Sequence, residues 1–498
     1  MNDELSDDIK SAIVSNKQRE LDLRMVPYDI WGTRAHVVML AETGIVDRDV
    51  ATDILQALEQ IEESVDNGEY EIDPDKGAHL SLESHIIDRA GEQAGLSTHT
   101  ARSRNDQVMV TELLYLRERV LDVLNQVGEL MDATIDLAGK HRDTVMPGYT
   151  HMQPAKPTTF ASWCLAYANA FHRSAQNLMD QYERFDRCPL GAVESYGTSW
   201  PIDRERTAEL LGFSQVWTIT QDVVSSRGQY QYALLTALNE LMLTAGKAAS
   251  DLLLYSTHES DYVDFGENVT QRLHPITGSS VMAQKKNPDA LELVRGTAPQ
   301  LAGMLQSVTG LLSGLPTGYN RDSREVKEYI TNGLSLTETG LSSLIETVST
   351  LQVHEDKMLE AVEENYSLTT DIADGLAQET GIPYRKMYDI VGEAVNQAIK
   401  DGRSLSELSQ SDIEQQAQEE GVELSLEGID LKNLLDPETA LSKRTHTGGT
   451  APEELDHQME RLRDDHSHLS DWVGTQHDRI HEARDRTRNA IRDITHES

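Results

Sequence analysis

The residues best suited to chemistry lie between Gly278 and Arg295. A glycine and two serines are followed by lysine, amide and carboxylate side chains, and a helical run begins at Pro288. Proline is tolerated at a helix start because its missing N–H would have no partner there. Lysine, asparagine and free N–H groups are suited to receiving a carboxylate. The segment predicts a mobile loop with a reactive serine and an anion site; an ordinary polar loop is the alternative.

A second polar loop covers residues 98–107 and contains Arg102, Arg104 and Asn105. Arginine and asparagine at close spacing are suited to binding an anion through two hydrogen bonds at once. A polar helix cap with solvated arginines explains the same residues nearly as well. On its own, this loop therefore indicates an anion site without establishing one.

A third loop, residues 147–154, places His151 between two prolines. A stiff backbone and a pKa that is ordinarily near neutrality are suited to a positioned acid or base. A lone histidine is nevertheless more often a hydrogen-bonded structural residue. A fourth polar loop follows at 319–327.

The chain has neither an HExxH pattern nor paired Cys/His spacing, so we predict no metal site. It also has neither a glycine-rich phosphate loop nor a dinucleotide fingerprint, so neither kind of nucleotide site is predicted.

The elements that must hold these loops are predicted to be long helices. Proline is scarce (14 residues), aromatic content is 5%, and apolar residues recur at spacings of three and four. The predicted long helices cover 111–141, 158–185, 223–257, 289–313 and 325–357. Apolar residues on more than one face of 289–313 favour burial inside an oligomer. We expect an all-α fold with an elongated central bundle.

Three units are expected along the chain: an N-terminal helical domain (1–108), a long-helix bundle (109–360) and a small C-terminal helical domain (361–498). The last of these ends in a charged helix over 453–494, with apolar residues at heptad-like spacing. We interpret this helix as solvated or packed on the rest of the protein, with coiled-coil pairing as an alternative.

The overall charge excludes some partners. Asp and Glu number 84 against 44 Lys and Arg, a formal net charge of −40 spread along the chain. Such a surface repels nucleic acid and anionic lipid, so we expect neither as a partner. Adaptation to high salt explains the charge better than an acidic partner-binding surface does. Two cysteines, Cys164 and Cys188, and the absence of a long apolar run predict a cytoplasmic protein.

Three of the loops, read in order, resemble those of the argininosuccinate lyases, a branch of the fumarase/aspartase superfamily. They are HTARSRNDQV (99–108), PGYTHMQPAKPTTF (147–160) and GSSVMAQKKNPDALELVRG (278–296). The resemblance covers roughly residues 25 to 450. It implies a three-domain, mostly helical subunit in a homotetramer, whose active sites are each built from loops of three subunits. The implied reaction needs no cofactor and eliminates fumarate from argininosuccinate, leaving arginine.

The resemblance also implies roles for individual residues. Ser279 handles the proton on carbon, and His151, hydrogen-bonded by Glu292, moves the proton for the departing nitrogen; which of Ser279 and His151 is base and which is acid stays open. The residues implied to bind the substrate are Ser103, Arg104, Asn105, Thr150, Lys285, Asn287, Tyr319, Arg324 and Lys327.

The chain departs from the family pattern at several positions. Ala283 stands where the family's signature loop, residues 278–288 in this chain, has proline, and Arg324 stands where glutamine is usual. The second change falls near the end of the site that holds the amine in the family. Elimination of fumarate is therefore predicted more firmly than the amine that leaves. The alternatives are a paralogue that cleaves another N-substituted aspartate and a catalytically silent structural relative.

Overall fold

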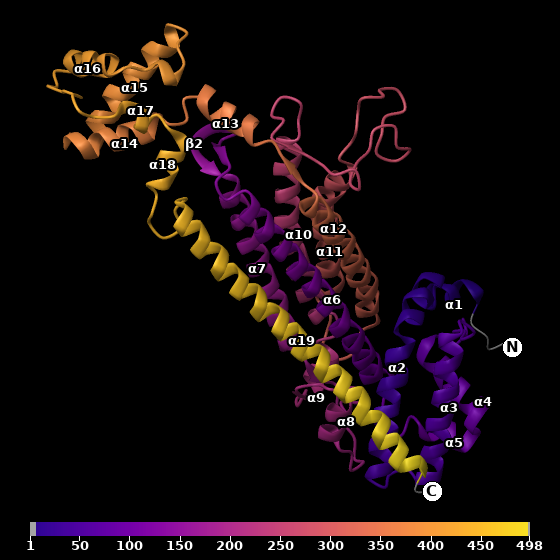
Figure 1. The fold of residues 1–498 in the computed structure, drawn as a ribbon. Coiled ribbons are helices and arrows are strands. Elements are labelled where there is room, and N and C mark those ends of the chain that lie inside the picture. Colours follow the sequence, from indigo (N-terminus) through magenta and orange to yellow (C-terminus); the bar gives the residue numbers. More distant parts are fainter. Residues whose placement is uncertain (1–5, 497–498) are drawn as a thin grey trace.

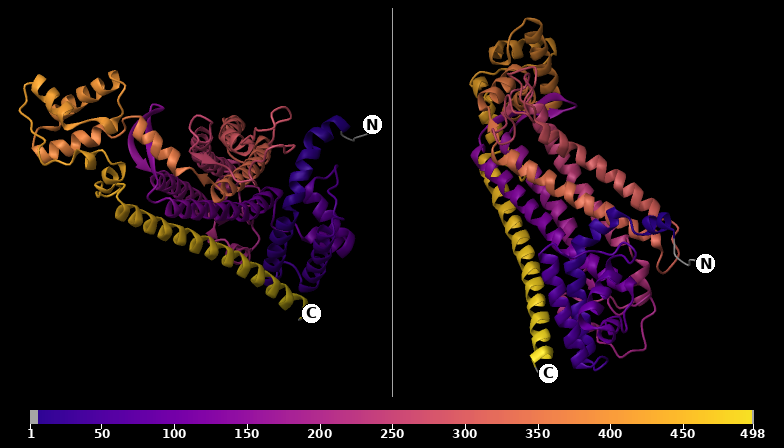
Figure 2. Two further views of the ribbon diagram at one scale, coloured as in Figure 1. Left: turned by 45° about the horizontal axis from the view of Figure 1, so that its top comes forward. Right: turned by 90° about the vertical axis from the view of Figure 1, so that its right-hand side faces the viewer.

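The protein is an elongated bundle of long helices with a helical unit at each end (Figures 1 and 2). The structure, a computed structural model, describes residues 6–496. The bundle is built from α6 (Arg104–Lys140), α7 (Phe160–Phe185), α10 (Gln229–Tyr255), α11 (Asp289–Leu312), α12 (Val326–Ser349) and α19 (Pro452–His496). These bounds confirm the all-α fold class, and the five predicted long helices are reproduced with shifted ends.

Apolar spacing explains why these segments form a bundle. On α10, Leu234, Leu238, Leu241 and Ala245 recur every three or four residues, and all four are buried in the main core. A helix gains most of its stability from packing such a face against its neighbours. The core consequently runs along the length of the bundle.

The N-terminal unit covers one end of the bundle and shares its core. It consists of α1 (Asp7–Ile13), α2 (Asn16–Glu42), α3 (Arg48–Asp66), α4 (Ala78–Ala90) and α5 (Glu92–Ser97). Buried residues of α2 and α3 belong to the same apolar cluster as those of α6. The boundary expected at residue 108 falls inside the first turns of α6, where the chain passes from this unit into the bundle without a break.

The C-terminal unit at the other end has an apolar core of its own, formed by residues 368–440. Its helices are α13 (Glu355–Glu364), α14 (Thr369–Thr380), α15 (Tyr384–Lys400), η2 (Leu405–Glu407), α16 (Gln410–Glu419), α17 (Leu431–Leu434) and α18 (Pro437–Ser442). The expected unit 361–498 also included the terminal helix α19, but the structure packs α19 along the bundle (Figure 1). Its heptad-spaced side chains, such as Leu462, Leu469 and Val473, are buried in the main core.

Short elements connect the long helices. They are the strand pairs β1 (Val145–Thr150) with β2 (Gln153–Thr159), β3 (Arg187–Cys188) with β4 (Gln215–Val216) and β5 (Val263–Asp264) with β6 (Gln352–Val353), the helices α8 (Arg204–Leu210) and α9 (Thr220–Ser225), and the 3₁₀ helix η1 (Arg321–Glu325). The β1–β2 hairpin projects from the end of the bundle that carries the C-terminal unit (Figure 1). In residues 6–496 no helix combines the length and apolar character that a membrane crossing requires.

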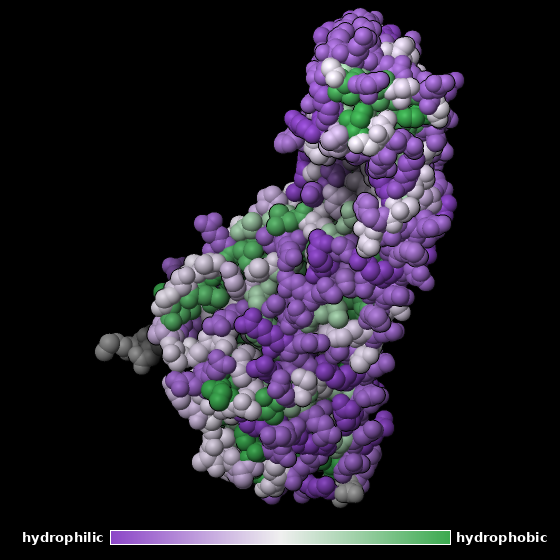
Figure 3. Space-filling view, turned by 90° about the vertical axis from the view of Figure 1, so that its left-hand side faces the viewer, coloured by the Kyte–Doolittle hydropathy of each residue, from purple (hydrophilic) through white to green (hydrophobic). Residues whose placement is uncertain are grey.

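On the face seen in Figure 3, hydrophilic residues dominate the surface, with smaller apolar areas between them. This distribution matches the net charge of −40.

Candidate active site

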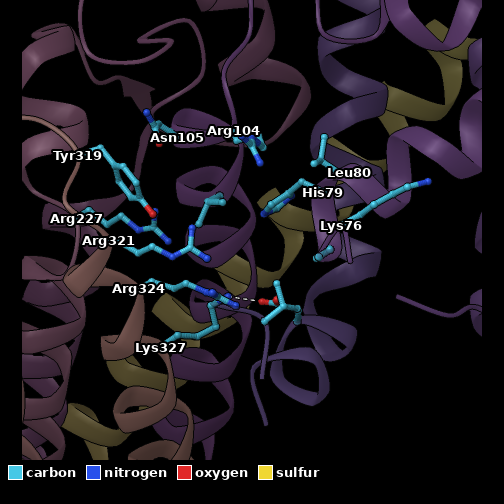
Figure 4. Close-up of a pocket in the computed structure, with 15 residues that line it drawn as sticks. Lys76, His79, Leu80, Arg104, Asn105, Arg227, Tyr319, Arg321, Arg324 and Lys327 are labelled. Atoms are coloured by element: carbon cyan, nitrogen blue, oxygen red, sulfur yellow. Dashed lines mark hydrogen bonds and ion pairs between the residues drawn. The ribbon is translucent and has the colours of Figure 1, made fainter. Parts of the chain in front are cut away.

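A solvent-open cavity lies where the N-terminal unit meets the bundle (Figure 4). Its volume of about 180 Å³ admits a small organic ligand rather than a single water. Five of the predicted substrate-binding residues come together in its walls: Arg104, Asn105, Tyr319, Arg324 and Lys327. The structure thus brings together the second polar loop (98–107) and the fourth (319–327), which lie more than 200 residues apart in the sequence.

Arg104 and Asn105 are positioned by the first turn of α6. Ser103 is the N-cap, and with Asp106 it forms a capping box that fixes the direction of the helix start. The carboxylate of Asp106 is buried and accepts the backbone N–H groups of Ser103 at 3.0 Å, Gly191 at 3.0 Å and Val193 at 2.9 Å. Burial raises the pKa of Asp106 to about 6, against the lowering effect of those hydrogen bonds. This anchor was not predicted, and only the S-x-x-D spacing in the sequence could have indicated it.

The opposite wall is formed by the fourth loop. Arg321 donates a hydrogen bond to the backbone oxygen of Ile13 at 3.1 Å, and Arg324 donates to the same oxygen. Lys327 is buried and paired with Asp22. The Tyr319 ring lies under the guanidinium of Arg227, with 5.2 Å between its centroid and the Cζ atom.

A histidine that sequence reasoning missed also lines the cavity. His79 Nδ1 lies 2.7 Å from a carboxylate oxygen of buried Asp29, which also accepts a hydrogen bond from Gln107 at 2.7 Å. Burial by itself would raise the pKa of Asp29, but the charge and hydrogen bond of His79 and the hydrogen bond of Gln107 lower it overall. A carboxylate at Nδ1 fixes the orientation of the ring and leaves Nε2 for a ligand. The two partners are 50 residues apart, so no local motif announces the pair.

The third predicted loop is the tip of the β1–β2 hairpin. Thr150 pairs with Gln153, and His151 and Met152 form the exposed turn between them. Both turn residues have positive φ, 55° for His151 and 61° for Met152. A two-residue hairpin turn of this hand prefers asparagine and glycine, and each other residue costs on the order of 1 kcal/mol or more. The backbone therefore holds His151 outward at an energetic cost.

The signature loop folds back on itself at the same end of the bundle. Gly278 forms an isolated bridge with Lys286, and the Asn287 N–H donates to Thr277 at 2.8 Å. Ser279 is half-buried, and its hydroxyl oxygen accepts the backbone N–H groups of Val281 and Met282.

The charged side chains of this segment differ in whether they are paired with another side chain or exposed to solvent. Lys286 is paired with Asp264 at 2.5 Å, whereas Lys285 is exposed. Glu292 is exposed in the first turn of α11. Within the described part of the chain, no hydrogen bond or ion pair joins Glu292 to His151.

The predicted residues of one chain thus form two groups at opposite ends of the bundle. Arg104 begins α6, and the hairpin that carries Thr150 and His151 follows its other end. Because α6 has 37 residues, its ends are about 55 Å apart. Similarly, α11 separates the signature loop from Tyr319. One subunit cannot bring both groups to one small substrate.

Two further observations bear on the chemistry of the protein. In residues 6–496 no three or more His, Cys, Asp and Glu side chains are grouped as metal ligands. Cys164 and Cys188 are buried free thiols, and burial raises the pKa of both.

Comparison with known proteins identifies the family of the chain and agrees with its fold. A lyase family model matches residues 10–303, and a model of the argininosuccinate lyase C-terminal region matches residues 366–442. The argininosuccinate lyase of Lactococcus lactis subsp. cremoris strain MG1363 is 37% identical over 445 residues, which cover 89% of this chain and 94% of that protein. That of Desulforamulus reducens is 34% identical and covers 93% of this chain and 96% of its own length.

Solved structures show the same fold. An EDDS lyase in complex with formate superposes with a TM-score of 0.86 at 25% identity, covering 97% of this chain and 96% of that one. A class II fumarase from Schistosoma mansoni shares the fold at 15% identity, with a TM-score of 0.68 over 86% of this chain and 91% of that one. The matched models and the identity to these relatives over most of their length show that the chain belongs to the argininosuccinate lyase family of carbon–nitrogen lyases.

Proposed function

We propose that this protein cleaves argininosuccinate into fumarate and arginine. The observation that carries the proposal is the pairing of family membership with a cavity that gathers Arg104, Asn105, Tyr319 and Lys327. These side chains supply the cations and hydrogen-bond donors that a substrate with three carboxylates requires.

The chemistry consists of removing a weakly acidic proton from the carbon beside a carboxylate. The C–H and C–N bonds break, a C=C bond forms, and the departing nitrogen receives a proton. The transient dianion on the carboxylate needs preorganised positive charge and donors. Ser279 and His151 divide the two proton transfers, Glu292 raises the basicity of His151, and Lys285 with Asn287 holds the carboxylate that takes the charge.

The remaining predicted residues position the substrate. Ser103, Arg104, Asn105 and Thr150 surround the fumarate half, while Tyr319, Arg324 and Lys327 hold the amine half. A free serine is too weak a base for this task, so the signature loop closes to exclude water and places Ser279 beside cations and N–H groups. Ala283 gives this loop more conformational freedom than a proline would.

We also propose that each active site is shared between subunits of a homotetramer. The two groups of predicted residues at opposite ends of the bundle support sharing, because neighbouring antiparallel subunits bring opposite ends together. The exposed face of α11 supports the assembly. From Gly296 to Leu312 this helix has no charged residue, in a chain that is 26% charged.

The same face is flat enough to accept another helix. Gly296, Gly303 and Gly310 recur at intervals of seven, and a Cβ atom added at any of them meets nothing within 4 Å in the subunit. An uncharged stripe without side chains allows close helix contact. We further propose that the enzyme works in cytoplasm of high salt content, where screening shortens the range over which its acidic surface repels itself.

The test is direct. Purified protein in molar KCl receives argininosuccinate, and fumarate is followed by its absorbance while arginine is identified by mass spectrometry. Equal amounts of both products support the proposal. A folded tetramer that releases neither product overturns it in favour of a silent structural relative.

The second candidate function is cleavage of another N-substituted aspartate. The observation that favours it is the charge of the cavity.

A further inference from the structure

The charge of the cavity is opposite to that of the protein. Its lining contains six cationic side chains and one carboxylate, Asp22, which gives it a formal charge of +5 in a chain whose net charge is −40. The six cations are Lys76, Arg104, Arg227, Arg321, Arg324 and Lys327. They reach the cavity from four separate segments of the chain, at Lys76, at Arg104, at Arg227 and over 321–327 (Figure 4).

Half of these cations have carboxylate partners. Lys327 is paired with Asp22, and Arg227 lies 3.7 Å from Glu112. Lys76 lies 3.6 Å from Asp73 at the rim.

The other half have none. Arg104, Arg321 and Arg324 have no carboxylate within ion-pair distance in residues 6–496. Arg321 and Arg324 instead donate to the carbonyl oxygen of Ile13, the last residue of α1. Two guanidinium groups that converge on one neutral oxygen mark the place where an anionic oxygen binds more strongly.

This charge determines which amine the cavity favours. When arginine is the leaving amine, it has two positively charged groups, a guanidinium and an α-ammonium, and only one carboxylate. It therefore brings two positive charges into a cationic cavity. An amine with two carboxylates presents the opposite sign and can pair with Arg321 and Arg324, the unpaired arginines that do not face the fumarate half.

We propose that this cavity accepts N-substituted aspartates whose amine half carries two carboxylates, in preference to those whose amine half carries a guanidinium. The proposal rests on the proposed elimination of fumarate at this site and names a further substrate class for it. The reaction balances without a co-reactant: the C–H and C–N bonds break, the C=C bond of fumarate forms, and the proton lost from carbon is matched by one gained at nitrogen. The other product is an amino dicarboxylic acid.

The experiment compares two substrates on the full-length protein in the same molar KCl buffer. Argininosuccinate and iminodisuccinate, whose leaving amine is aspartate, are followed by fumarate release and product mass. We expect kcat/KM for iminodisuccinate to be higher by about tenfold or more, which corresponds to about one net charge interaction.

Each outcome decides between the two proposals. Turnover of both substrates with this preference supports both, whereas turnover of iminodisuccinate alone supports the inference and overturns the assignment of argininosuccinate. A preference for argininosuccinate, or turnover of it alone, overturns the inference and leaves the proposed function standing. Silence with both overturns both.

A variant tests the residues involved. Arg324→Gln should raise KM for iminodisuccinate by about tenfold and lower that for argininosuccinate, because it removes an uncompensated cation. Lys386→Gln is the matched control: it removes one positive charge from an exposed pair with Glu420 in the C-terminal unit and should move neither KM. Equal changes in both KM values with Arg324→Gln would show a general loss of folding or binding, and would contradict the inference.

Discussion

Equal amounts of two inactive variants, Arg104→Ala and His151→Asn, should recover activity when their subunits are mixed. Both side chains are exposed in the subunit, so neither change removes core packing. Each variant alone should retain less than about 1% of wild-type kcat, since each lacks a group that the reaction needs.

The recovery follows from the distance between the two residues. α6 has 37 residues, which separates Arg104 from the hairpin by about 55 Å, far beyond the reach of one substrate. A site that uses both must take them from different subunits. In a random equal mixture, an intact Arg104 and an intact His151 each occur about half of the time, so about one quarter of the sites are complete.

The assay dissociates the two variants, mixes them at equal concentration, reassembles them in molar KCl and measures fumarate release. Each variant treated alone is the control. About one quarter of wild-type activity is the expected value. If both residues acted within one subunit, every chain in the mixture would carry one defect. Activity no higher than the mean of the two parents would therefore refute the reasoning.

Three further predictions concern separate parts of the molecule. Ser279→Ala should lower kcat by about a thousandfold or more with circular dichroism and assembly unchanged; retained turnover would remove Ser279 from proton transfer. Gly303→Glu places a carboxylate on the uncharged face of α11, where an unpaired buried charge costs several kcal/mol, so analytical ultracentrifugation should detect smaller species; an intact tetramer would place the interface elsewhere. The raised pKa of Asp106, about 6 against 3.8 for an unperturbed carboxyl, means that the folded protein holds this proton more tightly. Its contribution to the free energy of unfolding should fall by about 1.4 kcal/mol per unit as pH rises from about 4 to 6. Asp106→Asn should lack that slope in urea titrations, and an unchanged slope would contradict the assignment.

Local patterns in the sequence were enough to define the elements and the loops. The long helices were predictable because apolar spacing of three and four residues is a local property that burial then selects, as on α10. The polar loops were recognisable because they interrupt these helices with polar side chains and prolines at short spacing. The seven-residue recurrence of apolar side chains in 453–494 likewise predicted a helix, although it did not specify the surface that this helix covers.

Only the tertiary structure decided which residues meet. Arg104 and Arg324 share a cavity, and His79 pairs with Asp29, because chain reversals bring distant segments together; no local spacing records such contacts. The same reversals place the hairpin and the signature loop at the end of the bundle opposite this cavity, which makes sharing between subunits a geometric requirement for a common site. They also determine the charge of the cavity, since six cations spread over some 250 residues become one electrostatic feature only when the chain folds. The sequence by itself indicated the class of chemistry and the positions of the polar loops, and the packing of rigid helices decided how far apart those loops lie.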